Sequence, residues 1–190
     1  MPGTRRHLVS GTVGVESVPF YSPLNGEYGQ RVPSNDRVPD QVFDDDELLY
    51  RRFREQDFVD GEPAPAALKF DDNSGHSVNR GKYCQPQDVL EPDCCNDVLL
   101  LGYAVYSLSV AEIPKSKTVG ERTFRLTPKH VPEPKCYPHS EIWCNQSGRI
   151  EDPFEKPPTL IRQYFRGELW RSMQKRPALR FAPFGDTEAR

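Results

Sequence analysis

Apolar residues alternate with other residues along short stretches in the middle of this chain, and this pattern limits the fold more than any other feature. Successive side chains of a β-strand point to opposite faces of a sheet, so a period of two is typical of strands that bury one face. The stretches that we expect to form strands are 48–53, 76–80, 103–113, 120–128 and 139–144. They predict a small, mostly antiparallel sheet whose strands are joined by turns.

One segment near the C-terminus has a different period. In PPTLIRQYFRGELWRSMQKR (157–176) the apolar residues recur at helical spacing after a Pro-Pro-Thr start signal. This spacing predicts one amphipathic helix with a largely basic second face. A sheet and one C-terminal helix around a common core make an α+β fold.

Prolines and glycines interrupt every period at the start of the chain and again after the predicted helix. We therefore expect an extended arm over 1–42, a single α+β core domain over 43–176 and an extended tail over 177–190. Consecutive acidic residues at 44–47 precede the core. Carboxylates of this kind bind divalent cations in some proteins, although a solvated surface is their commoner use.

The size and charge of the chain limit the number of domains, the classes of partner and the cellular locations that we expect. A length of 190 residues suits one core, and 25 basic against 28 acidic residues leave a net charge of −3, which attracts neither nucleic acid nor anionic membranes. The longest apolar run, 98–110, is shorter than the roughly 20 residues of a membrane-spanning helix. The first residues lack the pattern of a secretory signal, and five irregularly spaced cysteines do not suggest a disulfide framework. We expect a soluble, cytoplasmic protein with reduced thiols.

The stretch KHVPEPKCYPHSEIWC (129–144) concentrates histidine and cysteine, which are the ligands that zinc prefers. A zinc site would use His130, Cys136, His139 and Cys144. The usual pair of cysteines two residues apart is absent, however. The alternative is a proline-stiffened connector over 129–138 followed by a strand that buries Cys144.

The same stretch also supports an enzyme hypothesis. In a strand over 138–144, His139 and Glu141 would share one face, as a general base with an orienting carboxylate or as a pair of metal ligands. The segment 76–80 would add His76, Ser77 and Arg80 if the two strands were neighbours. The chain contains no Gly-x-Ser-x-Gly nucleophile elbow and no phosphate-binding glycine loop. The hypothesis is therefore a His-centred or metal-dependent hydrolase or transferase.

Our leading hypothesis from the sequence is a non-enzymatic accessory subunit that docks on a larger protein through its arms and its C-terminal helix. Basic and aromatic residues are interleaved on this helix, as nucleic-acid contact requires, but the aromatic residues follow its apolar face. A protein partner is therefore favoured over nucleic acid. The residues that we expect to make this interaction are Arg162, Arg166, Trp170, Arg171 and Lys175.

Overall fold

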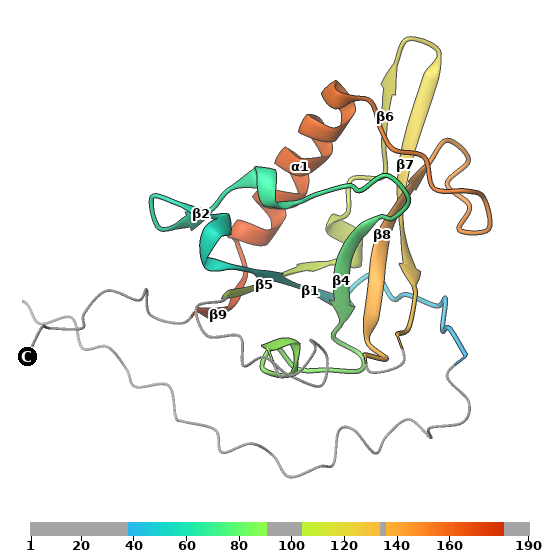
Figure 1. The fold of residues 1–190 in the computed structure, drawn as a ribbon. Coiled ribbons are helices and arrows are strands. Elements are labelled where there is room, and N and C mark those ends of the chain that lie inside the picture. The colour runs from blue at the N-terminus through green and yellow to red at the C-terminus, as the bar shows by residue number, and fades with distance from the viewer. Residues whose placement is uncertain (1–37, 91–103, 134–135, 181–190) are drawn as a thin grey trace, which may run out of the picture. The chain divides into compact units, whose positions relative to one another are not determined.

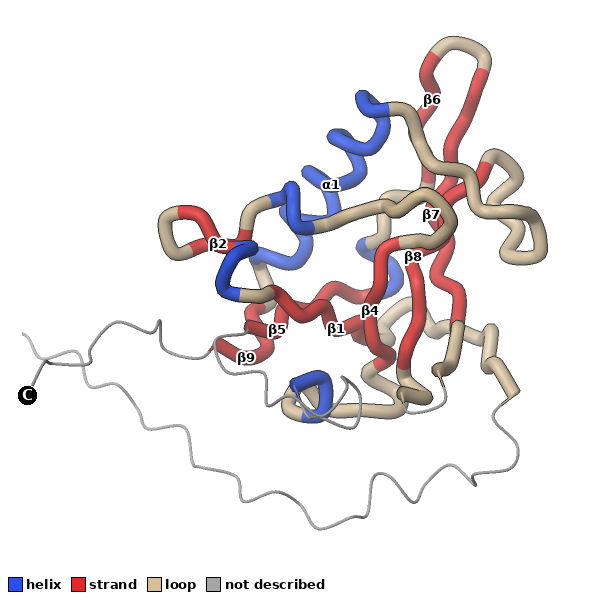
Figure 2. The backbone as a smooth tube through the Cα atoms, in the orientation of Figure 1, coloured by secondary structure: helices blue, strands red, loops and turns tan. Residues whose placement is uncertain are grey.

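A computed structural model describes residues 38–90, 104–133 and 136–180. Within these ranges seven strands form one sheet, two very short strands form a separate hairpin, and one long helix is present (Figures 1 and 2). The helix α1 spans Thr159–Gln174. The strands are β1 (Leu48–Phe53), β2 (Phe58–Val59), β3 (Glu62–Pro63), β4 (His76–Arg80), β5 (Ala104–Ser109), β6 (Ser116–Val119), β7 (Arg122–His130), β8 (His139–Asn145) and β9 (Pro177–Arg180). Single turns of 3-10 helix lie at Glu55–Asp57, Pro65–Ala67, Asp88–Leu90 and Val110–Glu112.

The strands of the main sheet follow the order β6-β7-β8-β4-β1-β5-β9, and each of these pairs is antiparallel. Together with the single long helix, this arrangement confirms the predicted α+β fold with a mostly antiparallel sheet. Strands β4 and β8 are neighbours although β5, β6 and β7 separate them in the chain. Long-range pairing of this kind brings distant polar residues together.

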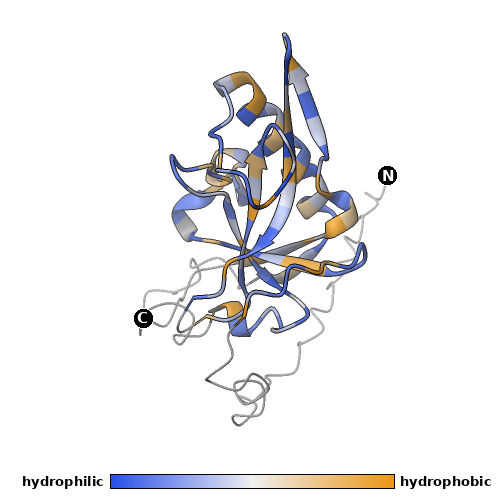
Figure 3. Ribbon diagram, turned by 90° about the vertical axis from the view of Figure 1, so that its right-hand side faces the viewer, coloured by the Kyte–Doolittle hydropathy of each residue, from blue (hydrophilic) through white to orange (hydrophobic). Residues whose placement is uncertain are grey.

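One face of the sheet packs against α1 and forms the main core. The helix buries Ile161, Phe165, Leu169 and Met173, and the sheet contributes residues such as Ile142, which has no exposed surface. In β8 the buried residues alternate with half-buried ones, as the sequence predicts for a strand with one apolar face. Figure 3 shows the same alternation of hydrophobic and hydrophilic residues along the strands.

Two positions illustrate how glycine fixes the backbone. Asp60 and Gly61 connect β2 to β3 with φ angles of 52° and 79°, the two positive values that a type I′ hairpin turn requires. The Asp-Gly pair is a strong hairpin signal, and it predicts this turn better than the prolines that follow it. Gly75 precedes β4, where an added Cβ would lie 2.4 Å from the carbonyl oxygen of Ile142. Only glycine lets the chain enter the sheet there.

The ends of three predicted segments differ from expectation. The strand predicted over 103–113 stops at Ser109, because the Ser109 backbone N–H and hydroxyl both donate to Glu112 and start a 3-10 turn. Strand β7 continues through His130, so the predicted connector begins only after that residue. In the predicted C-terminal tail, residues 177–180 pair with β5 as strand β9.

The predicted N-terminal arm overlaps the described residues only at 38–42, and the rest of the arm and residues 181–190 lie outside them. No helix in the described ranges combines the length and the apolar character that crossing a bilayer requires.

Candidate functional site

The candidate site lies where β4 runs beside β8. In the register of these strands Ser77 is opposite Glu141 and Asn79 is opposite His139. The two segments of the enzyme hypothesis are therefore direct neighbours. Their contact depends on the strand order of the sheet, which no local pattern in the sequence indicates.

Ser77 and His139 form a hydroxyl–imidazole pair. The Ser77 Oγ lies 3.2 Å from His139 Nε2, and His139 Nδ1 lies 2.8 Å from the carbonyl oxygen of Val131. A carbonyl oxygen can only accept, so Nδ1 carries the ring hydrogen and the lone pair of Nε2 faces the serine hydroxyl. Glu133 Oε1 lies 3.7 Å from the same Nδ1. This is the order of groups that activates a serine: nucleophile, base and a group that orients the base.

Polar side chains on the same face surround this pair. The Gly75 backbone N–H donates to Glu141 Oε2 at 2.8 Å, so Glu141 is held by the start of β4. The groups next to His139 Nδ1 are the carbonyl oxygen of Val131 and the carboxylate of Glu133, rather than Glu141 as expected. Lys129 of β7 is opposite Glu141, and its Nζ lies 4.0 Å from the ring centroid of Trp143. The side chain of His139 is 14% exposed, which leaves the ring shielded but reachable.

Arg80, which the enzyme hypothesis places with the serine, lies on the opposite face of β4. Its guanidinium is fully buried and donates twice to Glu47, at 2.7 Å each, and to the carbonyl oxygens of Asp40 and Val42 at 2.5 and 2.6 Å. The guanidinium carbon also lies 3.9 Å from the ring centroid of Phe43. Arg80 therefore fastens residues 40–47 to the sheet and cannot stabilise charge at Ser77.

His76 shares this second face and is also fully buried. Burial holds its pKa well below the usual value of 6.5, and the positive charge of Arg51 lowers it further. Its Nδ1 lies 3.3 Å from the carbonyl oxygen of Lys69. His76 is a neutral core residue, and it points away from the Ser77–His139 pair because alternate residues of a strand face opposite ways.

The four proposed zinc ligands do not converge. His139 and Cys144 lie on opposite faces of β8, and burial raises the pKa of the Cys144 thiol to about 12, so it is not a thiolate. His130 Nδ1 accepts from the backbone N–H of Asp40 at 2.9 Å, and its Nε2 lies 2.7 Å from another backbone carbonyl, so both ring nitrogens are engaged. Burial lowers the pKa of His130 as well.

Cys136 donates to the Asn79 side-chain oxygen at 3.4 Å. Among the described residues no three histidine, cysteine or acidic side chains come close enough to hold a metal ion. The predicted zinc quartet therefore has no counterpart in the described part of the chain.

The predicted interaction residues of α1 divide into buried and exposed members. Trp170 is only 7% exposed and packs edge-on against Phe53 and Tyr106, so it belongs to the core. Arg171 is exposed and forms an ion pair with Glu168 of the same helix. Lys175 is exposed, whereas Arg162 and Arg166 are half-buried. Of the five, only Arg171 and Lys175 have exposed side chains.

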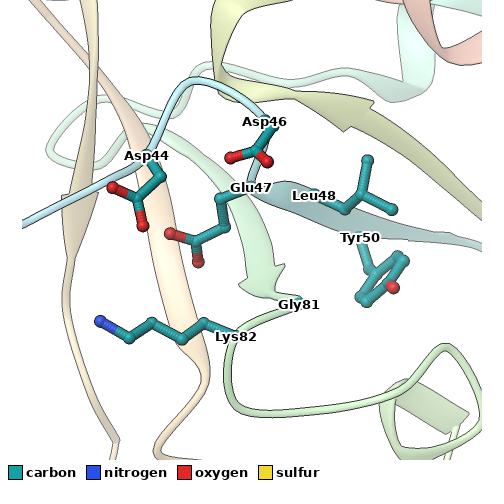
Figure 4. Close-up of a pocket in the computed structure, with 7 residues that line it drawn as sticks. All are labelled: Asp44, Asp46, Glu47, Leu48, Tyr50, Gly81 and Lys82. Atoms are coloured by element: carbon teal, nitrogen blue, oxygen red, sulfur yellow. The ribbon is translucent and has the colours of Figure 1, made fainter.

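A shallow recess of about 300 Å³ lies at the start of β1 (Figure 4). The carboxylates of Asp44 and Glu47 gather on one side of it, and Leu48 and Tyr50 line the other side. Glu47 already accepts both hydrogen bonds from Arg80, as described above. The recess therefore holds the acidic run expected from the sequence without the three-ligand cluster that a cation site needs.

No family model, no curated protein and no solved structure matches this chain. Its function is therefore inferred from its own residues.

Proposed function

We propose that this protein is a hydrolase or acyl transferase in which Ser77 is the nucleophile and His139 is the general base. One observation carries the proposal: the imidazole Nε2 lies 3.2 Å from the hydroxyl while Nδ1 is held by a backbone carbonyl. This tautomer leaves the basic nitrogen facing the serine, as nucleophilic catalysis requires.

The reaction follows from this geometry. Ser77 Oγ attacks an acyl carbon and passes its proton to His139 Nε2, while the electron pair of the carbonyl moves onto its oxygen. When the tetrahedral intermediate collapses, the bond to the leaving group breaks and His139 returns the proton to that group. Water, or an acceptor alcohol or amine, then cleaves the acyl-serine by the same steps in reverse.

Neighbouring residues support each charge that forms. The carbonyl oxygen of Val131 and the carboxylate of Glu133 lie next to Nδ1 and stabilise the imidazolium. Lys129 lies opposite Glu141 on the same face of the sheet, and we assign to its positive charge the stabilisation of a developing oxyanion.

The test is labelling with a fluorophosphonate, which reacts covalently with an activated serine. We expect the intact protein to gain one adduct, and peptide mass spectrometry to locate the adduct at Ser77. Ser77→Ala should abolish the adduct, and His139→Gln should slow labelling by roughly 100-fold or more, as expected for loss of a general base. The matched control is Ser172→Ala, which removes a half-buried serine of α1 that is far from His139 in the chain.

Two results would reject the enzyme proposal. One is the absence of an adduct at Ser77 in the folded protein. The other is an adduct that forms at the same rate in His139→Gln, since that outcome would show that the imidazole does not activate the serine.

We propose as a second candidate that the chain is a cytoplasmic accessory subunit that docks on a larger protein. Strand β6 supports it: β6 lies at the edge of the sheet and all four of its side chains are exposed. Edge strands accept extended segments of a partner by strand addition. Leu160, which is 65% exposed at the start of α1, adds an apolar contact point.

His139→Ala separates the two candidates. An enzyme loses activity and keeps its fold, whereas an accessory subunit keeps its partner, because the ring lies away from β6 and α1. Size-exclusion chromatography with light scattering on protein from its native host should show a mass well above that of the single chain if the second candidate is correct. A free monomer whose arms both survive limited proteolysis would reject it.

A further inference from the structure

Three half-buried arginines have no acidic partner. Among the described residues, no carboxylate lies within 4.0 Å of the guanidinium groups of Arg51, Arg162 and Arg166. Other described arginines do form ion pairs with carboxylates, and these are Arg80, Arg122, Arg171 and Arg176. A half-buried guanidinium group without a counterion lowers the stability of the fold. The presence of three such groups therefore indicates a binding function.

Hydrogen bonds to one chain segment place these residues together. Arg166 Nε donates to the carbonyl oxygen of Leu68 at 2.7 Å, and His76 Nδ1 lies 3.3 Å from the carbonyl oxygen of the next residue, Lys69. Arg51 Nη1 donates to the backbone carbonyl oxygen of Ser77, the residue after His76, at 2.9 Å. Figure 1 shows the segment before β4 running beside α1, where Arg162 lies one turn before Arg166.

Polar nitrogen atoms in this region remain without a partner. Arg51 Nε, Arg162 Nε and His76 Nε2 are buried and make no hydrogen bond within the structure. A buried polar group left unpaired destabilises the fold, and more so when it is charged. Because Nδ1 of the neutral His76 ring donates to a carbonyl, its Nε2 is an acceptor.

The positive charges in this cluster act on one another. Burial lowers the pKa of Arg51 to about 10, and the pKa of Arg166 is lowered by burial and by the charge of Arg162. Asp57 and Asp71 offset part of this charge, since both raise the pKa of Arg51 and Asp71 also raises that of Arg166, while Arg52 and Arg54 add positive charge beside Arg51. The neighbouring Asp72 is already paired with Lys156. A net positive charge therefore remains between β1 and α1.

We propose that Arg51, Arg162, Arg166 and His76 form a binding site for a phosphate-bearing ligand. Guanidinium groups match phosphate oxygens in charge and geometry. A singly protonated phosphate also carries one hydroxyl group, and His76 Nε2 can accept a hydrogen bond from it. The site is separate from the Ser77–His139 pair, because His76 faces the other side of β4.

The test uses inorganic phosphate and the full chain. Isothermal titration calorimetry should detect saturable binding to the unchanged protein, and the double variant Arg162→Gln/Arg166→Gln should bind at least about tenfold more weakly, since one charged hydrogen bond contributes roughly 1.5–3 kcal/mol. Arg171→Gln/Lys175→Gln makes the same charge change on the exposed side of the same helix and should bind as the unchanged protein does.

A single variant guards against loss of the fold. Arg162 bonds only to Thr159 of its own helix in the described structure, so Arg162→Gln should stay folded and still weaken binding. Equal weakening in both double variants would overturn the proposal, because it would indicate general charge attraction. Absence of binding to the unchanged protein up to about 10 mM phosphate would overturn it as well. Fluorophosphonate labelling of Ser77 is a separate readout, so each proposal can fail alone.

Discussion

The two faces of β4 use polar residues in opposite ways. His76 and Arg80 point to the face where the core lies, have no exposed surface, and Arg80 is fully engaged in bonds to residues 40–47. Ser77 points to the other face, is half-buried, and meets the imidazole of His139. The same short strand therefore supplies a structural clamp on one side and the hydroxyl of the Ser77–His139 pair on the other. Residue type does not distinguish these roles, whereas the face and the degree of burial do.

The largest loss of stability that we expect comes from removing the guanidinium of Arg80, which fastens residues 40–47 to the sheet. Arg80→Ala leaves Glu47, whose side chain is 6% exposed, as a buried and unpaired carboxylate. We expect the free energy of unfolding to fall by about 3–5 kcal/mol, measured by urea denaturation. Arg171→Ala removes an exposed arginine and should cost less than about 0.5 kcal/mol. Similar stabilities for the two variants would show that Arg80 is not a clamp.

Low pH should destabilise the fold, because His76 and His130 are buried as neutral rings. Burial lowers the pKa of His76 and of His130, so below roughly pH 6.5 the unfolded chain binds protons that the folded chain does not. The free energy of unfolding should therefore fall as the pH drops, by up to about 1.4 kcal/mol per pH unit for each histidine, until the pH at which the folded ring itself takes up a proton. Urea midpoints between about pH 7.5 and pH 5 would measure this slope, above the range where most carboxylates titrate.

The control for this pH dependence is His130→Gln, which removes one of the two groups. We expect this variant to retain the part of the slope that His76 causes. A urea midpoint of the unchanged protein that does not move over this pH range would contradict the assignment of neutral, buried rings.

The Gly75→Ala substitution tests whether the close approach of the chain before β4 to strand β8 is needed for stability. Gly75→Ala places a Cβ 2.4 Å from a backbone oxygen of Ile142, which cannot move aside as a side chain can. We expect a loss of about 1–3 kcal/mol in the free energy of unfolding. The matched control is Gly167→Ala in α1, where an added Cβ meets nothing within 4 Å. This control should gain roughly 0.5–1 kcal/mol, because alanine favours the helix.

The smallest effect on stability should come from the reactive pair itself. His139→Gln removes a half-buried ring and keeps polar groups that can bond to Ser77 or Val131, so we expect less than about 1 kcal/mol of destabilisation. Labelling of Ser77 should nevertheless decline strongly, as described above. A loss of stability as large as that of Arg80→Ala would instead place His139 among the structural residues.

Local patterns predicted the elements of this fold well. The period of two in 48–53, 76–80 and 139–144 and the helical spacing after residue 157 all correspond to elements of the structure. The same alternation could have shown that Ser77 faces the other side of the strand from His76 and Arg80, because both lie an odd number of residues away from it. The Asp60-Gly61 turn was also available from the sequence.

The partners of each strand could not be predicted in this way. Pairing of β4 with β8 joins segments more than fifty residues apart, and hydrogen bonds between backbones carry no residue code that marks such a partner. The grouping of Arg51 with Arg162 and Arg166 likewise depends on where α1 packs. The sequence by itself determined the helix α1 and most of strands β1, β4, β5, β7 and β8, because their periods follow from local geometry, whereas β6 and β9 are strands through their pairing with β7 and β5. Only the tertiary structure decided that Ser77 meets His139 and that Arg80 meets Glu47, because those contacts depend on the order and register of strands that are distant in the chain.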